Sequence, residues 1–338
     1  MRLVYDEIYG DHLRGIPHAE SPDRVEMVAA FLQESGRFDD VVKPRSATDE
    51  EIERAHTPEY LARVKSEIDA LRGVAAYLST GDTVVDRRSL HVAKRAAGGA
   101  IAAVEATASD NRPSFALIRP PGHHAESRRG MGFCVFNNAA IAARAFQAAQ
   151  GGRVLIVDFD YHHGNGTQEL SGRGISYVST HAYPAYPGTG SADENERTGE
   201  DLIANVPLPT HDFGTEAFLA VWKQLLPLAA AAVRPSLIVA SAGFDYVAKD
   251  PVGDLGVAWS AATPLALLVA DTAAEYCDGR AVFLLEGGYN IAALQESVAR
   301  VIDAFDRPSE VTTSNAEPAA IPQAQARILE RVAAAADG

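Results

Sequence analysis

The sequence is short of cysteine, of uninterrupted apolar runs and of positive charge. Its 338 residues contain two cysteines, Cys134 and Cys277, which are too few for a disulfide framework and typical of a reducing compartment. We find no stretch that approaches the run of about 20 apolar residues needed to cross a membrane. The chain reaches Asp6 without the apolar segment of a secretory signal. We therefore expect a cytoplasmic protein that does not enter a membrane.

Basic residues are outnumbered by acidic ones, 30 Lys and Arg against 45 Asp and Glu, which gives a formal net charge of −15 at pH 7. A surface of this sign disfavours broad contact with a phosphate backbone and mildly attracts a cationic ligand, so we expect no nucleic-acid partner. With 47% apolar residues, the chain can bury a large core. We expect one domain over residues 1–306 and a C-terminal tail at 307–338 with a marginal helix from Gln323 to Ala336. The oligomeric state is left open.

Short apolar runs alternate with helical patterns along most of the chain. The expected strands are 3–5, 115–118, 154–157, 175–178, 204–208, 237–240 and 282–285. The expected helices are 22–35, 49–56, 58–71, 89–108, 138–150, 215–233, 260–277 and 291–305. Ser21 followed by Pro22 has the signature of a helix start. The alternation predicts an α/β fold with a mainly parallel sheet, in which functional groups collect beyond the carboxyl ends of the strands.

The segment 154–168 is the most informative part of the sequence, because four apolar residues lead directly into two carboxylates and two imidazoles. In an extended segment, Asp158, Asp160 and His162 lie at i, i+2 and i+4, so their side chains leave on one side. Carboxylate and imidazole together favour a divalent cation, with zinc the first candidate. The alternative is a helix cap followed by a solvated turn, which seldom needs so many ligating groups.

A second expected strand, 115–118, runs into Arg119-Pro120-Pro121-Gly122 and then His123 and His124. The two prolines stiffen the chain and the glycine permits a tight turn, so both histidines are presented at a fixed place. Two histidines at the start of a loop can also be structural. That alternative is weakened because a neighbouring strand ends in further metal-ligating residues.

Two later strands are each followed within a few residues by a side chain that could act in the site, one a carboxylate and the other a phenol. Asp245 follows the strand at 237–240, and Tyr289 follows the strand at 282–285. Taken alone, Asp245 is as compatible with a cap as with a ligand, and Tyr289 with simple packing. Beside Asp160 and His162, Asp245 supplies a third protein ligand and leaves a zinc ion one open position for water. A phenol hydroxyl beside a metal is a natural partner for an oxyanion.

These motifs together resemble the zinc-dependent histone deacetylase family, which includes bacterial histone-deacetylase-like amidohydrolases and acetylpolyamine amidohydrolases. The matching segments are 119–125, 132–138, 154–168, 179–181, 187–190, 241–245 and 286–290, in unbroken order. The resemblance implies the three-layer αβα sandwich that this family shares with arginases, with a mainly parallel sheet of about eight strands. It also implies hydrolysis of an acyl group from an amine by metal-activated water.

The resemblance further implies a role for each residue of the site. One zinc ion would be held by Asp160, His162 and Asp245. The histidines would serve as general base and acid in an order that stays open. Asp158 would orient His123 and Asn165 would orient His124, each by a hydrogen bond, and the tyrosine would stabilise the oxyanion. These catalytic residues are His123, His124, Tyr289, Asp158 and Asn165. A structural potassium site would involve Asp158, Asp160, Ser179 and the carbonyls of His162 and Thr180. His163 has no assigned role.

Substrate contacts are also implied by the resemblance. Phe133 and Tyr186 would form the walls of an acyl-lysine tunnel, Gly132 would keep it narrow, and Asp82 would grip the substrate at the rim. The residues expected to bind substrate are Gly132, Phe133, Tyr186, Asp82 and Val252. Arg24 would line an inner channel for acetate or, equally, form a salt bridge.

Val252 stands where polyamine specialists can carry a glutamate, so a small-molecule or peptide substrate of the acyl-lysine type is favoured. An acetylpolyamine is the alternative substrate. Two other classes are less favoured. A binuclear-manganese ureohydrolase would need carboxylates that Gly164-Asn165-Gly166 does not provide. A non-catalytic acyl-lysine binding module would be expected to lack at least one of the catalytic groups.

Overall fold

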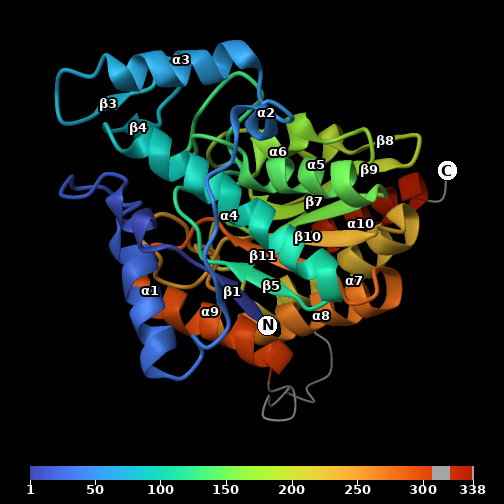
Figure 1. Ribbon diagram of the computed structural model, residues 1–338. Helices are drawn as coiled ribbons and strands as arrows, with labels where there is room; N and C mark the ends of the chain where they lie inside the picture. Colours follow the sequence, from blue (N-terminus) through green and yellow to red (C-terminus); the bar gives the residue numbers. More distant parts are fainter. Residues whose placement is uncertain (307–319, 337–338) are drawn as a thin grey trace.

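Figure 1 shows the computed structural model, which describes residues 1–306 and 320–336. Within these residues nine strands form one sheet in the order β2-β1-β5-β11-β10-β6-β7-β9-β8. Their bounds are β1 Arg2–Val4, β2 Val41–Val42, β5 Ser114–Ala116, β6 Val154–Asp158, β7 Ile175–Ala182, β8 Glu196–Thr198, β9 Asp201–Leu208, β10 Leu237–Ala242 and β11 Ala281–Leu285. All neighbours are parallel except β8, which pairs with β9 in the antiparallel sense.

Helices cover both faces of the sheet, so the expected three-layer αβα sandwich is confirmed. On one face α1 (Asp23–Glu34), α9 (Ile291–Asp306), α8 (Ala262–Tyr276) and α7 (Thr215–Val233) pack side by side in that order. On the other face α4 (Ser89–Asp110) packs against α5 (Asn138–Gln150), as Figure 1 shows. The smaller elements are α2 Asp49–Ile52, α3 Pro58–Asp69, α6 Asn165–Leu170, the strands β3 Ala76–Tyr77 and β4 Val84–Val85, and 3₁₀ turns at Glu7–Asp11, Ala192–Glu194 and Trp259–Ala261.

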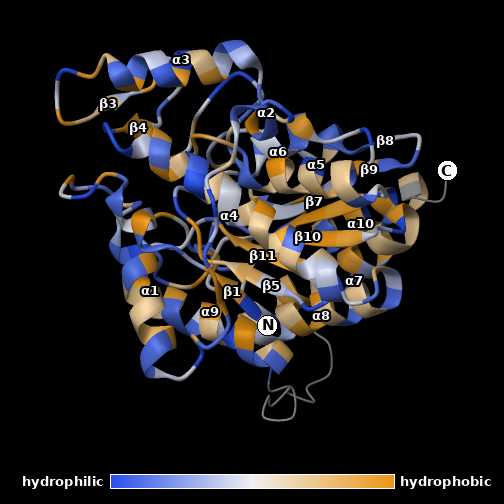
Figure 2. Cartoon of the chain, in the orientation of Figure 1, coloured by the Kyte–Doolittle hydropathy of each residue, from blue (hydrophilic) through white to orange (hydrophobic). Residues whose placement is uncertain are grey.

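The main core lies between the sheet and these two helical layers. Every residue of β5, β6, β10 and β11 is buried, as expected for central parallel strands covered on both faces. Figure 2 shows β5, β10 and β11 mainly in apolar colours, whereas the helices also carry hydrophilic residues. A second hydrophobic cluster joins α2, α3, α4 and α5. The central strands are thus fixed firmly, and their C-terminal ends are held in place.

Some boundaries differ from those expected. Ser21 does not cap α1, because the helix begins at Asp23 with Pro22 as its N-cap and without a side-chain cap bond. The helix expected at 49–56 ends at Ile52. The strands β2 and β8 were not predicted, since runs of two or three residues are too short to show a periodicity. The sheet therefore has nine strands in the described chain instead of about eight.

The last described helix, α10 (Gln323–Ala336), has the bounds expected from the sequence and packs against α7 and β9. Leu329 and Val332 are buried there, so the helix contributes to the core. The rest of the expected tail, 307–319 and 337–338, lies outside the described residues.

The expectation that no stretch is long and apolar enough to span a membrane was wrong. Within the described residues α7 is long and apolar enough to cross a membrane by length and composition. The structure packs it against α8, α10 and β9, and half of the apolar window is buried. An apolar core helix has the same composition, so this feature is accounted for by packing.

Candidate active site

The candidate site lies at the C-terminal ends of four adjacent strands, β5, β11, β10 and β6. Because these strands are parallel neighbours, the segments that follow them emerge at the same edge of the sheet. The register places Asp158 opposite Ser241 in β10 and opposite Ser179 in β7. The sheet therefore gathers the histidines, carboxylates and tyrosine that the sequence places at separate strand ends.

Asp160, His162 and Asp245 form a cluster in which one ligand atom of each lies within 4.8 Å of the others. His162 Nδ1 is 2.8 Å from Asp245 Oδ2 and 3.2 Å from Asp160 Oδ1. Backbone amides hold the other carboxylate oxygens: Tyr161 N donates to Asp245 Oδ1 at 2.9 Å, and Gly287 N donates to Asp160 Oδ2 at 2.8 Å. The three predicted ligands are thus brought together and oriented.

The cluster fits a divalent cation by its burial and its charge. Asp160 and Asp245 are buried, and the contact of Asp245 Oδ2 with the His162 ring lacks the geometry of a hydrogen bond. Burial and the neighbouring Asp160 carboxylate raise the pKa of Asp245 to about 7. A cation would relieve this repulsion, and two carboxylates with one imidazole are ligands that zinc accepts.

The two histidines predicted for catalysis lie beside this cluster, each with the partner expected from the sequence. His123 Nδ1 is 3.0 Å from Asp158 Oδ2, and His124 Nδ1 is 2.8 Å from Asn165 Oδ1. The two rings lie 4.0 Å apart between centroids. One histidine is therefore paired with a buried carboxylate and the other with a neutral amide.

This difference separates the proton affinities of the two rings. Burial alone lowers the pKa of His123, but the carboxylates of Asp160 and Asp158 raise it to about 10. Burial and the positive charges of His123 and His162 hold the pKa of His124 well below its ordinary value. In the metal-free site these shifts favour the positively charged form of His123 and the neutral form of His124.

Tyr289 lines the same pocket and is held by a buried arginine. The guanidinium of Arg24 lies 4.8 Å from the centre of the Tyr289 ring and donates to Gly288 O at 2.7 Å. Arg24 also forms a fully buried salt bridge with Glu20, with Nη1 3.0 Å from Oε1. Of the two roles predicted for Arg24, the structure therefore contains the salt bridge. Arg24 also fixes the loop that carries Tyr289.

Two residues of the site were missed by the sequence reasoning. Glu286 is fully buried, and its Oε2 accepts hydrogen bonds from Gly122 N at 2.6 Å and His123 N at 3.1 Å. Tyr177 donates from its hydroxyl to Asp158 Oδ2 at 3.1 Å. A carboxylate directly after the apolar strand at 282–285 was a usable signal for Glu286. No sequence signal distinguishes Tyr177 from an ordinary core residue of β7.

A cavity of about 320 Å³ contains most of these groups. Tyr186 and Phe133 are among its walls, and Val252 is also part of the lining. Gly132 has φ +55°, and a Cβ there would lie 2.2 Å from His124 Cδ2, so only glycine fits. The full lining is Asp82, Pro121, His123, His124, Gly132, Phe133, Asp160, His162, Tyr186, Val252, Gly287 and Tyr289. All five residues expected to bind substrate are thus present in one cavity.

Ser179 and Thr180 lie on β7 and are not part of the lining of this cavity. Ser179 Oγ is 2.9 Å from His181 Nδ1, and Thr180 Oγ1 is buried without a hydrogen-bond partner in the described structure. His163 is directed away from the metal ligands, since its ring nitrogens lie 2.8 Å from Thr189 Oγ1 and 2.9 Å from Gln168 Oε1.

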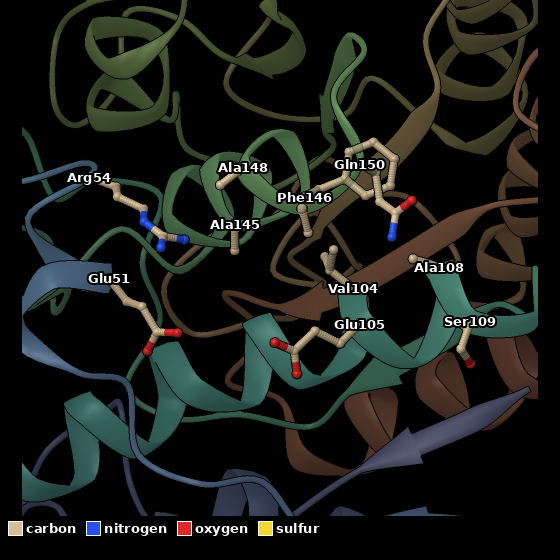
Figure 3. A pocket seen from close by; sticks show the side chains of 11 residues that line it. Glu51, Arg54, Val104, Glu105, Ala108, Ser109, Ala145, Phe146, Ala148 and Gln150 are labelled. Atoms are coloured by element: carbon tan, nitrogen blue, oxygen red, sulfur yellow. The ribbon is translucent and has the colours of Figure 1, made fainter.

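A separate hollow of about 400 Å³ lies between α4 and α5, next to α2 (Figure 3). Val104 and Phe146 supply part of its apolar surface, and Glu51, Arg54 and Glu105 are charged residues on its lining. It shares no residue with the cavity described above. We therefore treat it as distinct from the candidate active site.

Comparison with known proteins identifies the family. Residues 18–305 match the family described as "Histone deacetylase domain". The chain belongs to the histone deacetylase family. The crystal structure of the HDA15 HD domain is similar to this deacetylase-family chain with a TM-score of 0.86 and 31% sequence identity, covering 99% of this chain and 93% of the other.

Sequence relatives within the histone deacetylase family include plant and bacterial proteins. Histone deacetylase 15 of Arabidopsis thaliana is 37% identical over 296 residues, which cover 85% of this chain and 52% of the relative. A histone deacetylase-like amidohydrolase of Pseudomonas aeruginosa is 35% identical over 284 residues, covering 81% of this chain and 73% of the relative. The chain spans 52 to 63% of the length of three plant relatives.

Proposed function

We propose that the protein is a zinc-dependent deacetylase that hydrolyses the amide of an acylated amine. The observation that carries this proposal is a single cavity of about 320 Å³ in which two buried histidines and a tyrosine face two of the three candidate metal ligands. A carboxylate oxygen of Asp245, the third candidate ligand, lies within 4.8 Å of a ligand atom of each of the other two. Membership of the histone deacetylase family supports the same reaction.

Asp160, His162 and Asp245 would hold the zinc ion. When bound, zinc supplies a Lewis acid that polarises an amide carbonyl and lowers the pKa of water to near neutrality. The backbone amides that bind Asp160 and Asp245 keep the two carboxylates in place for this role. The two buried carboxylates also balance the charge of the cation.

His124 would be the general base. The amide nitrogen of Asn165 donates to Glu126 Oε1 at 2.7 Å, so the amide oxygen is the atom that faces His124 Nδ1. Nδ1 must therefore carry the hydrogen, which leaves the Nε2 lone pair free to accept a proton from water. The same nitrogen could then deliver that proton to the leaving amine.

His123 would act mainly through its charge. Its Nδ1 is bonded to the Asp158 carboxylate, which itself receives a second hydrogen bond from Tyr177. A protonated His123 beside the reacting carbonyl would stabilise negative charge as it develops. Tyr289 would donate its hydroxyl hydrogen to the same oxyanion, held in position by Arg24.

For the substrate we propose an acyl-lysine or a similar acylated amine, with an acetylpolyamine as the alternative. Val252 lines the cavity where a second ammonium would need a carboxylate, and Asp82 and Asp160 are the only acidic residues of that lining within the described chain. A direct test compares an acetyl-lysine peptide with acetylated putrescine, using zinc-loaded protein and a hydroxamate chelator as control. Faster turnover of the polyamine would reverse this ranking.

A structural potassium ion near Asp158 remains part of the proposal. Asp158 and Ser179 lie opposite each other in neighbouring strands, and Thr180, whose carbonyl is the predicted ligand, follows Ser179 in the same strand. To test this site, hydrolysis and thermal unfolding are measured in a potassium salt and in a salt of a bulky monovalent cation at equal ionic strength. Identical stability and activity in both would remove the potassium site.

A further inference from the structure

We infer that the rim of the cavity selects acyl-lysine residues flanked by acidic side chains, and that Arg128 and Arg129 make this selection. This inference rests on the proposed function, because it specifies the substrate of the same cavity. Its starting point is a contrast in charge. The whole chain has a formal net charge of −15, yet two adjacent exposed arginines lie on the loop between His124 and Gly132, two residues that line the cavity.

The loop that carries the two arginines is fixed against the cavity rim. Ser127 N and Oγ both bond to the Glu169 carboxylate at 2.7 Å. Further along, a Cβ placed on Gly81 would lie 2.2 Å from Gly130 O, so this backbone touches the turn that precedes Asp82. Gly132, next but one in the chain, lines the cavity itself. The loop that carries the two arginines is therefore anchored beside the cavity.

Neither guanidinium is neutralised. Arg128 and Arg129 are exposed, and across 1–306 and 320–336 neither side chain has a hydrogen-bond or ion-pair partner. Arg129 is close enough to affect the cavity wall. Burial and the Asp82 carboxylate raise the pKa of Tyr186, and the positive charge of Arg129 acts in the opposite direction.

The carboxylates around the rim already have donors. Asp82 accepts from the hydroxyl of Tyr186 at 3.0 Å and from a backbone amide at 2.8 Å. Glu126 accepts from an asparagine amide at 2.7 Å, and Glu169 is bonded to a serine. These donors are neutral groups, so the three carboxylates keep their charge, but within the described residues none of them is paired with Arg128 or Arg129.

An acidic peptide satisfies these groups. A peptide whose acyl-lysine enters the cavity leaves its flanking residues at the rim, where guanidinium forks bind carboxylates with two parallel hydrogen bonds. The two arginines therefore favour an acyl-lysine flanked by acidic residues over one flanked by basic residues.

The test uses three acetyl-lysine peptides of equal length that differ only in flanking glutamate, glutamine or lysine. Both kcat/KM and binding by fluorescence anisotropy are measured with zinc-loaded full-length protein at low and high salt. Exposed charge pairs of this kind give about a three- to tenfold preference for the glutamate peptide over the glutamine peptide, decreasing at high salt. Arg128→Gln combined with Arg129→Gln should bring this ratio close to one.

The matched control is Lys223→Gln combined with Arg234→Gln, two exposed cationic residues at α7 and its C-terminal end. It removes the same charge and should keep the preference. Equal binding of the three peptides by the wild type, or a preference that survives in the Arg128 and Arg129 variant, would overturn the inference. Binding that follows the order glutamate, glutamine, lysine without hydrolysis of any peptide would contradict the proposed function and support the charge selection.

Discussion

The oxygen of the Asn165 side chain accepts a hydrogen bond from Nδ1 of His124 at 2.8 Å. The opposite end of this amide is fixed by Glu126, so its orientation is determined by the surrounding structure. A neutral acceptor at this point fixes the tautomer of His124 without adding charge. The corresponding partner of His123 is a carboxylate, and the two rings are thereby prepared for different tasks.

We predict that Asn165→Asp shifts the acid limb of the pH profile to higher pH. An added carboxylate raises the pKa of His124, and a general base works only above its own pKa. The neutral form of the ring would therefore appear at higher pH than in the wild type. The measurement is kcat/KM between pH 5 and 9, and an unmoved acid limb would exclude His124 as the base.

We predict that Tyr289→Phe lowers kcat by about 10²–10³-fold, as expected for the loss of one oxyanion donor. Zinc content and unfolding temperature should stay close to wild type, because the ring and its contact with Arg24 are kept. Tyr276→Phe, on α8 away from the cavity, is the matched control. Unchanged turnover in Tyr289→Phe would remove this hydroxyl from the mechanism.

Removing divalent metal should both abolish hydrolysis and destabilise the fold. Asp160 and Asp245 are buried together, and His162 offsets their repulsion only in part, since the pKa of Asp245 stays raised to about 7. Zinc at about 100 times its Kd should restore about 2.7 kcal/mol of stability. Thermal unfolding with and without zinc measures this, and Asp245→Asn should respond much less. Equal unfolding temperatures of wild-type apo and zinc-loaded protein would argue against the site.

Stability should fall as pH decreases from about 6.5 to 4. The buried ring of His56 lies 2.9 Å from Glu126 O through Nδ1 and accepts from Asn137 N through Nε2, a pattern that requires the neutral form. Burial lowers its pKa to about 4, so the native state resists protonation that the unfolded chain accepts below its ordinary pKa. The loss is on the order of 3 kcal/mol for this group.

Denaturant unfolding at pH 7.5, 5.5 and 4.5 measures this dependence, with His56→Gln as the variant that lacks the titrating ring. The variant should be less stable at pH 7.5 and show a shallower decline. A wild-type curve as flat as that of the variant would contradict the assignment of a neutral buried His56.

The sequence identifies the parts of the site that follow directly after strands. Asp160, His162 and Asp245 could be found because a buried parallel strand has a recognisable apolar run, and its C-terminal end is where ligands collect. The same reasoning located His123, His124 and Tyr289. The pairings of His123 with Asp158 and of His124 with Asn165 came from family resemblance, and the structure contains both contacts.

Other parts of the site could not be predicted because they depend on packing between distant segments. Glu286 binds backbone amides more than 160 positions away in the chain, and Arg24 reaches Tyr289 from the first helix. Single residues of this kind leave no periodicity or spacing. The short strands β2 and β8 were missed for a related reason, since their pairing is set by neighbouring strands and not by their own pattern.

The central claim is that one metal ion, held by Asp160, His162 and Asp245, supports amide hydrolysis in this cavity. The most direct measurement is acetate release from an acetyl-lysine peptide while metal-free protein is titrated with zinc. We predict that activity rises linearly and reaches its plateau at one equivalent, with Asp245→Asn inactive throughout. Activity that requires two equivalents of manganese and is absent with zinc would contradict this account.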